Sequence, residues 1–274
     1  MKNKKKRIKI VFVLFIVIVI IGIGYALAGN KNKNNCGCAD DCGCGATSAV
    51  ECKCSEEKQE QQIEEKSIQN INTQNKNVTI IIDPGHGSFD GGACAKDGTP
   101  EKDINLEISL KTVELLRNND YNVIMTRESD EIPNDDPSTP IKSRKNADLK
   151  RRLEITNEYI GKNAVLISIH QNKFPDSKYS GAQMFYSENE KSKQLAEKMQ
   201  SAFKEKFDKS SNRMAKSVPN ANYIFKKLVI PGIIIECGFL SNEKDLAKLK
   251  TDEYKQMIAE VIADTIIEYF KENV

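Results

Sequence analysis

Apolar and polar residues alternate along residues 78–274 with two different periods. Short β-branched and aliphatic runs predict strands, and longer stretches with apolar residues three or four positions apart predict helices. Strands are predicted at residues 78–82, 122–126, 164–169, 182–186 and 232–236. Helices are predicted at residues 100–118, 149–160, 191–207, 243–250 and 253–272. This order predicts a single α/β domain, with a twisted, mostly parallel sheet that helices cover on both faces.

Two of these helices have a distinct apolar face. It is formed by Ile104, Ile108, Leu115 and Leu116 in the first helix, and by Ile258, Val261, Ile262, Ile266 and Tyr269 in the last. Both faces are expected to pack on the sheet. Residues 127–148 are rich in Asp, Pro, Ser and Lys and predict a long loop. Because long loops inside a domain are usually functional, this one is expected to form part of a substrate groove.

The N-terminal pattern is different and predicts a membrane segment. Residues 10–28 are uncharged and mostly aliphatic, and they follow a basic stretch at residues 1–9. Residues 1–28 therefore predict a membrane anchor or a signal sequence. The length favours an anchor, whereas Ala26, Leu27 and Ala28 would permit cleavage. Since the basic flank stays in the cytoplasm, the rest of the chain is expected to be exported, either anchored to the membrane or secreted.

Residues 29–77 have the composition of a flexible linker, with many Asn, Lys, Gln and Glu residues and few apolar ones. Three Cys-x-Cys pairs lie within it, Cys36/Cys38, Cys42/Cys44 and Cys52/Cys54. Such pairs can chelate a soft metal or form disulfides, or the segment can be a plain tether, and the sequence leaves these alternatives open.

The charge balance excludes one class of partner. The chain has 41 basic and 39 acidic residues, and six of the basic ones lie in residues 1–9. The remainder holds 35 basic against 39 acidic residues, so it lacks the positive charge of a nucleic-acid-binding domain. No nucleic-acid partner is expected.

The chain has only two histidines, and each directly follows a predicted strand or its turn. His86 lies in the sequence Asp-Pro-Gly-His-Gly, and His170 ends the run Ala-Val-Leu-Ile-Ser-Ile. The carboxyl ends of strands form the ligand crevice of open α/β sheets, and two imidazoles that meet there usually bind a metal. A catalytic zinc needs a third ligand. Glu101, in the first turn of a helix that Thr99 could cap, is one candidate, but the helix dipole alone also favours glutamate there.

A second carboxylate, Glu236, ends the aliphatic run Ile233, Ile234 and Ile235. Burying a charge at this point is costly unless it is paired, bound to metal or functional. A carboxylate beside a zinc ion can accept and return the proton of the attacking water, so Glu236 is the candidate general acid/base.

Four further residues have less specific interpretations. Cys237 is expected to be a small buried residue, because both histidines are assigned to the metal and neither remains to activate a thiol. Cys94 is also expected to pack in the interior. Asp83 can bond to the backbone near His86 or support the metal site, and Arg152 can contact substrate or brace the loops.

Five motifs resemble the zinc-dependent N-acetylmuramoyl-L-alanine amidases of bacterial cell-wall turnover. They are IIDPGHGSFDGGA around His86, EKDINL from Glu101, LKRRLEITN ending at Asn157, ISIHQN ending at Asn172, and ECGFLSN from Glu236. The resemblance implies a zinc amidase domain at residues 78–274, with one zinc ion bound by His86, Glu101 and His170 and with Glu236 as catalytic acid/base. It also implies cleavage of the amide between N-acetylmuramic acid and L-alanine of peptidoglycan. Ser88 and Thr156 depart from the family pattern, which often has glycine and alanine there.

The anchor followed by a single domain looks most similar to spore-cortex amidases that act in germination. The sequence does not decide between the vegetative wall and the spore cortex, nor whether an accessory or activating protein is needed. Two alternatives have other functions. A zinc peptidase or deacetylase would use the same metal chemistry on another wall bond, and a wall-binding module would keep the fold without catalysis.

Overall fold

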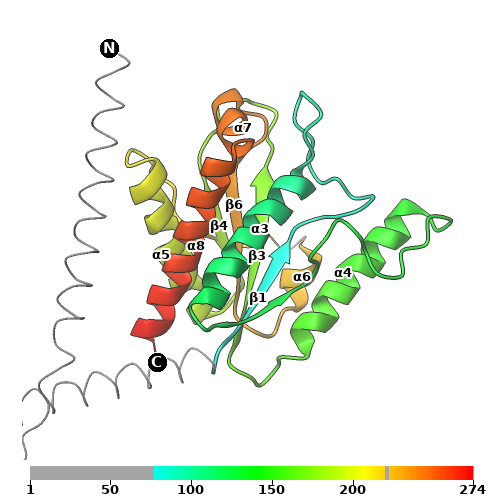
Figure 1. Cartoon of the computed structure of the whole chain (residues 1–274), viewed down its shortest axis with the longest axis horizontal. Helices are drawn as coiled ribbons and strands as arrows, with labels where there is room; N and C mark the ends of the chain where they lie inside the picture. Colours follow the sequence, from blue (N-terminus) through cyan, green and yellow to red (C-terminus); the bar gives the residue numbers. More distant parts are fainter. Residues whose placement is uncertain (1–76, 220–221, 274) are drawn as a thin grey trace, which may run out of the picture. The chain divides into compact units, whose positions relative to one another are not determined.

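Six strands form one sheet in residues 77–219 and 222–273, the part of the chain that this computed structural model describes (Figure 1). The strands are β1 (Thr79–Pro84), β2 (Asn122–Met125), β3 (Ala164–Asn172), β4 (Gln183–Tyr186), β5 (Lys216–Ser217) and β6 (Gly232–Phe239). The helices are α3 (Glu101–Asn118), α4 (Ile141–Asn157), α5 (Glu190–Phe207), α6 (Tyr223–Lys227), α7 (Glu243–Leu249) and α8 (Asp252–Glu272). The expected anchor at residues 1–28, and all but the last residue of the expected linker at residues 29–77, lie outside the described residues.

The sheet order is β2-β1-β3-β6-β4-β5. The strands β2, β1, β3 and β6 are parallel to one another, whereas β4 pairs antiparallel with β6 and parallel with β5. The carboxyl ends of β1, β3 and β6 therefore lie side by side at one edge of the sheet. A crevice at this edge is where open α/β sheets bind ligands.

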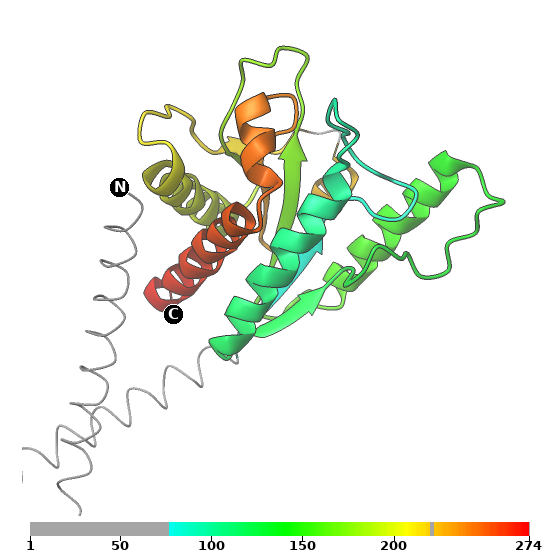
Figure 2. The same ribbon diagram turned by 45° about the horizontal axis from the view of Figure 1, so that its top comes forward.

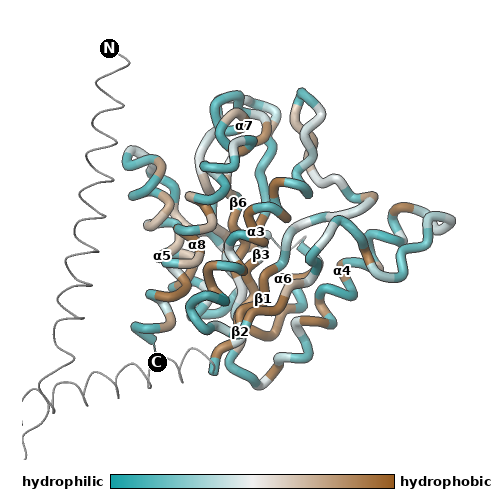
Figure 3. Tube along the Cα trace, in the orientation of Figure 1, coloured by the Kyte–Doolittle hydropathy of each residue, from teal (hydrophilic) through white to brown (hydrophobic). Residues whose placement is uncertain are grey.

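Two apolar cores cover the two faces of the sheet, because successive side chains of a strand point to opposite faces. Ile80 and Ile82 of β1 belong to the core that α3, α5 and α8 complete, and Ile81 belongs to the core that α4 and α6 complete. Figure 2 shows α3 and α8 next to each other, where they also contact one another. Figure 3 shows mostly hydrophobic residues along the central strands, and both hydrophobic and hydrophilic residues along the helices around them. The predicted mostly parallel α/β sheet with helices on both faces is confirmed.

The strongly periodic segments were predicted correctly within a few residues. All the apolar positions predicted in the last helix are buried in α8. In α3, Ile104, Ile108 and Leu116 are buried, and Leu115 packs partly buried against the same core. The short elements β5 and α6 were missed, since two and five residues are too few to show a period.

The predicted loop at residues 127–148 was wrong over its second part. Helix α4 begins at Ile141 and not at residue 149. Its first two turns are almost wholly polar and exposed, so they show no apolar face to predict a helix from. Thr99 also does not cap α3, because Pro100 occupies the N-cap position and no side chain bonds there.

Within the described ranges, no helix is both long and apolar enough to cross a bilayer.

Candidate metal centre

Adjacent strands place His170 and Glu236 together. His170 of β3 and Glu236 of β6 are direct partners in the parallel register, so both side chains leave the same face of the sheet. His86 follows the end of β1, the other neighbour of β3, and Glu101 is the first residue of α3. Three neighbouring strand ends and one helix start therefore bring these four residues to the same edge.

His86, Glu101 and His170 form one cluster, in which the potential ligand atoms lie within 4.8 Å of one another. His86 Nε2 is 3.3 Å from Glu101 Oε2, and His170 Nδ1 is 2.9 Å from Glu101 Oε1. The two imidazole rings meet edge to face, with centroids 5.0 Å apart. Two imidazoles and one carboxylate are the donor set of many catalytic zinc sites, so these residues suit a divalent metal.

Glu101 is only 3% exposed, yet its carboxylate is well supplied with donors. Its Oε2 accepts a hydrogen bond from Ala93 N at 2.8 Å, and its Oε1 accepts from Gln171 N at 3.1 Å and from Asn105 Nδ2 at 3.2 Å. Burial alone would raise the pKa of Glu101, but the bonds from the two histidines lower it. The carboxylate is therefore held ionised, as a metal ligand must be.

Two glycines let the backbone approach these side chains closely. A Cβ atom at Gly85 would overlap the His170 ring, and one at Gly92 would lie 2.6 Å from both Glu101 Oε2 and His86 Cδ2. Gly92 also has φ +71°, which side chains rarely adopt. The glycines around His86 therefore make room for the cluster.

His86 has an unusual backbone conformation, with φ 62°. Its carbonyl oxygen accepts a hydrogen bond from Arg152 Nη2, and its Nδ1 donates to Asp90 Oδ2 at 2.9 Å. The Asp90 bond leaves Nε2 to face Glu101. Burial lowers the pKa of His86, but the bonds to Asp90 and Glu101 outweigh it and raise the pKa to about 9.

Arg152 of α4 braces the His86 loop and is 2% exposed. Its guanidinium contacts Asp83 Oδ1 at 2.6 Å, Asp148 Oδ2 at 2.7 Å and the Pro84 carbonyl at 2.7 Å. Asp83 also accepts bonds from the hydroxyls of Thr126 and Ser168. Burial would raise the pKa of Asp83, but Arg152 and these hydroxyls lower it. Arg152 was expected either to contact substrate or to brace the loops, and the structure shows it bracing the His86 loop. Asp83 supports this loop indirectly, by its contact with Arg152.

Glu236 differs from Glu101 because nothing in the described residues satisfies its inner oxygen. The side chain is half-buried, and Oε2 is inaccessible to solvent and has no hydrogen-bond partner. Burial, together with repulsion from Glu101, raises the pKa of Glu236 to about 7. A carboxyl group with a pKa near neutrality can both accept and return a proton at physiological pH.

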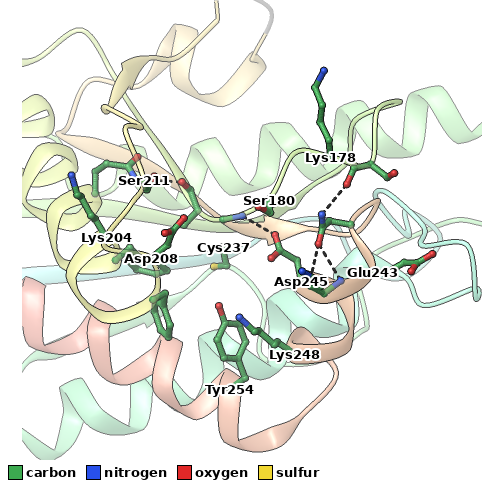
Figure 4. A pocket seen from close by; sticks show the side chains of 18 residues that line it. Lys178, Ser180, Lys204, Asp208, Ser211, Cys237, Glu243, Asp245, Lys248 and Tyr254 are labelled. Carbon is green, nitrogen blue, oxygen red and sulfur yellow. Dashed lines mark hydrogen bonds between the residues drawn. The ribbon is translucent and has the colours of Figure 1, made fainter.

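Two cavities in the described residues could hold a substrate, and they differ in size and position. A cavity of about 160 Å³ adjoins the two histidines, between Asp90, Lys145 and Tyr223. A cavity of about 520 Å³ lies on the opposite face of β6, and Figure 4 shows Cys237 at its wall among charged side chains of α5 and α7. The smaller cavity is the better candidate for the reaction site, because His86 and His170 line it.

Neither of the two cysteines in the described residues, Cys94 and Cys237, belongs to the cluster. Cys237 is 2% exposed, as predicted, and burial raises the pKa of its thiol. The expectation for Cys94 was wrong, because this residue is exposed in the loop before α3.

Three supporting residues were not predicted from the sequence. Asn105 lies one turn after Glu101 and bonds both Glu101 Oε1 and the Gly85 carbonyl. Asp90 contacts His86, and Lys145 of α4 contacts Asp90. A polar residue on the buried face of α3 could have indicated Asn105, whereas the segment that contains Lys145 was predicted as a loop.

An open α/β sheet with a His-Glu-His cluster and a nearby carboxyl group at its strand ends is the arrangement expected of a metal-dependent hydrolytic enzyme. Within this class, the chain belongs to the N-acetylmuramoyl-L-alanine amidase family, which matches residues 80–268. It is an N-acetylmuramoyl-L-alanine amidase by this family membership.

Individual relatives agree with this assignment. The germination-specific N-acetylmuramoyl-L-alanine amidase of Bacillus subtilis (strain 168) is 36% identical over 198 residues, which cover 71% of this chain and 80% of that protein. The solved structure of the CwlD amidase from Clostridioides difficile, in complex with the GerS lipoprotein, is 41% identical, with a TM-score of 0.67. It covers 71% of this chain and 98% of its own. An N-acetylmuramoyl-L-alanine amidase from Clostridium difficile 630 is 27% identical, with a TM-score of 0.61, over 73% of this chain and 100% of its own.

Proposed function

We propose that this protein is an exported zinc amidase that hydrolyses the amide between N-acetylmuramic acid and L-alanine in peptidoglycan. The observation that supports it most is the convergence of the His86, Glu101 and His170 ligand atoms within 4.8 Å. Beside them, the inner oxygen of Glu236 finds no hydrogen-bond partner in the part of the chain that the structure describes. One zinc ion would be held by these three side chains. It would supply Lewis-acid activation of water and of the scissile carbonyl.

The chain's own groups then handle the proton. Glu236 in its ionised form accepts a proton from the attacking water. It then donates this proton to the nitrogen of L-alanine as the amide bond breaks. The products are a lactyl carboxylic acid and a free alanine amine, and the acid then gives up its proton, so that the carboxylate and the ammonium group remain. A pKa near 7 suits both steps, because neither form of the carboxyl group is strongly favoured.

The substitution Glu236→Gln tests this role. We expect peptidoglycan hydrolysis to fall by roughly 10²- to 10⁴-fold, because Gln keeps the size of the side chain but cannot accept the proton. Zinc content, measured by atomic emission on the purified protein, should be unchanged. Glu243→Gln is the matched control, since Glu243 is exposed on α7. Activity of Glu236→Gln equal to that of the control would remove Glu236 from the mechanism.

Mass spectrometry of digested peptidoglycan distinguishes the proposed reaction from its alternatives. An amidase releases whole stem peptides with a free N-terminal alanine. A peptidase would leave alanine on the muramic acid, and a deacetylase would leave a free sugar amine. Either of the latter products alone would contradict the proposal.

The biological setting is also part of the proposal. The similarity to a germination-specific amidase supports a role in the spore cortex, and the relative solved with a lipoprotein supports an accessory protein for this chain too. The N-terminal segment would anchor the enzyme with its catalytic domain outside the cytoplasm. Protease added to intact protoplasts should degrade the domain if this is correct, and full protection would contradict export.

A further inference from the structure

Asp90 and Lys145 lie next to His86 in the folded structure, and neither has a role in the proposed reaction. Asp90 Oδ2 lies 2.9 Å from His86 Nδ1 and also 2.9 Å from Lys145 Nζ. The other oxygen, Asp90 Oδ1, accepts a hydrogen bond from Gly92 N at 3.3 Å. The three side chains form a continuous chain of contacts from helix α4 to the cluster, along the wall of the smaller cavity.

We propose that Asp90 and Lys145 are positioning residues, which fix the ring of His86 for zinc binding, with helix α4 as their support. The inference rests on the proposed zinc site. An ionised carboxylate can only accept hydrogen bonds, so Asp90 keeps the proton of His86 on Nδ1 and leaves Nε2 as the donor atom for a metal. A carboxylate on the second nitrogen of a histidine ligand also fixes the orientation of the ring.

The proposed role of Lys145 is to hold the Asp90 carboxylate in place, and not to contact His86 itself. Its side chain is 46% exposed, whereas that of Asp90 is 19% exposed. The ammonium group holds the same Asp90 oxygen that His86 contacts, which prevents the carboxylate from rotating into solvent. Arg152, two turns further along α4, binds the His86 carbonyl oxygen. Helix α4 therefore supports the His86 side chain indirectly, through Lys145 and Asp90, and the His86 backbone directly, through Arg152.

Zinc affinity, measured by competition with a chelator, tests the positioning role. The full chain is used, with the six cysteines of residues 36–54 replaced by serine so that they cannot bind zinc. We expect Asp90→Ala to weaken zinc binding by roughly 10- to 100-fold. Asp90→Asn should weaken it less, since the amide oxygen can still accept the Nδ1 proton. Lys145→Met should weaken it by a few-fold. Lys150→Met is the matched control, because Lys150 lies on α4 with a side chain that is 69% exposed, and it should leave affinity unchanged.

The histidine ring gives a second readout that a purely structural role would not change. Only two histidines exist in the chain, so nitrogen NMR of histidine-labelled protein shows only two rings. With zinc bound, His86 should be protonated on Nδ1 in the parent protein, and this proton should exchange faster with water in Asp90→Ala and Lys145→Met.

Three experimental outcomes would contradict, in turn, the zinc site, the positioning role of Asp90 and that of Lys145. If the parent protein binds no zinc at this site, the proposed function fails. If the parent binds zinc and both Asp90 variants bind it within about twofold of the parent, against the loss expected for such supports, the positioning role of Asp90 is wrong. If Lys145→Met raises the KM for peptidoglycan while zinc affinity and the Nδ1 proton stay unchanged, Lys145 contacts substrate and its positioning role is wrong.

Discussion

At the scale of single residues, the geometry of the site depends on a glycine, Gly85, as well as on the proposed metal ligands. A Cβ atom at Gly85 would occupy the space of the His170 ring, although the backbone there is not left-handed. Glycine is therefore required at position 85 because of the close approach to His170, and not because of the backbone conformation. Its carbonyl also accepts bonds from Asn105 and Arg127, so the glycine lies inside a rigid network.

The substitution Gly85→Ala should displace His170 and weaken zinc binding by roughly 10- to 100-fold, a loss similar to that caused by removing a ligand's support. The fold should persist, because alanine tolerates an ordinary φ. Chelator competition measures the affinity, and circular dichroism checks the fold. Gly91→Ala is the control, since its Cβ would meet only Pro100 at 3.8 Å. Equal zinc affinity for the two variants would show that His170 is not confined by Gly85.

Glu236 should make the stability of the protein depend on pH once zinc is removed by EDTA. Its folded pKa, about 7, lies above its unfolded value near 4.5, so the folded state binds more protons. The resulting stability is present below pH 4.5 and is lost as the pH rises to about 7. Glu236→Gln should therefore stabilise the protein by roughly 3 kcal/mol at pH 8 and hardly at pH 4.5. Urea unfolding at the two pH values measures this, and a pH-independent difference would contradict it.

At the scale of elements, helix α4 links the fold to the cluster. Its first turns are polar and exposed, and it is held to the sheet by Arg152 and by contacts of Leu153 in the core shared with α6. Arg152 neutralises Asp83 at the end of β1 and Asp148 on its own helix. A cation of different shape can replace only some of the bonds that this buried arginine makes to two carboxylates and two carbonyl oxygens.

Substituting Arg152→Met should destabilise the protein by about 3–5 kcal/mol, because Asp83 would be left charged, buried and without its partner. The variant Arg152→Lys should recover only part of this loss. Urea unfolding of both variants measures the free energy of unfolding. Lys150→Met, whose ion pair with Glu154 is exposed, should change it by less than about 0.5 kcal/mol. A loss for Arg152→Met no larger than that of the control would mean that the buried network does not hold α4.

At the scale of the whole molecule, the proposed ligands come from three separate parts of the chain. His86 follows β1, Glu101 begins α3 and His170 lies on β3, so they converge only when the sheet has formed. A metal that binds them binds the folded state and shifts the folding equilibrium towards it.

Zinc at a free concentration 100 times its dissociation constant should add about 2.7 kcal/mol of stability. This corresponds to a rise of roughly 5–10 °C in Tm for a domain of this size. Differential scanning fluorimetry with zinc and with EDTA measures the shift, in the chain that lacks the cysteines of residues 36–54. The double variant His86→Ala, His170→Ala should show no shift, and a similar rise in that variant would place the zinc elsewhere.

The linear pattern was enough to predict the α/β class, the long helices α3, α5 and α8, and the convergence of His86, His170 and Glu236 at the strand ends. These follow from local periodicity, and from the rule that the carboxyl ends of parallel strands share one edge of a sheet. Glu101 remained ambiguous on spacing, because the helix dipole and a metal favour the same residue type.

The side chains that support the proposed ligands, and the shifted pKa values of the site, could be found only in the folded arrangement. The start of α4 has no apolar period, so nothing local indicated that Lys145 reaches Asp90 or that Arg152 joins Asp83 to the His86 carbonyl. The raised pKa of Glu236 likewise arises from burial and from Glu101, which lies far away in the sequence. Desolvation and contacts between distant residues depend on the folded arrangement, and a linear pattern does not contain that information.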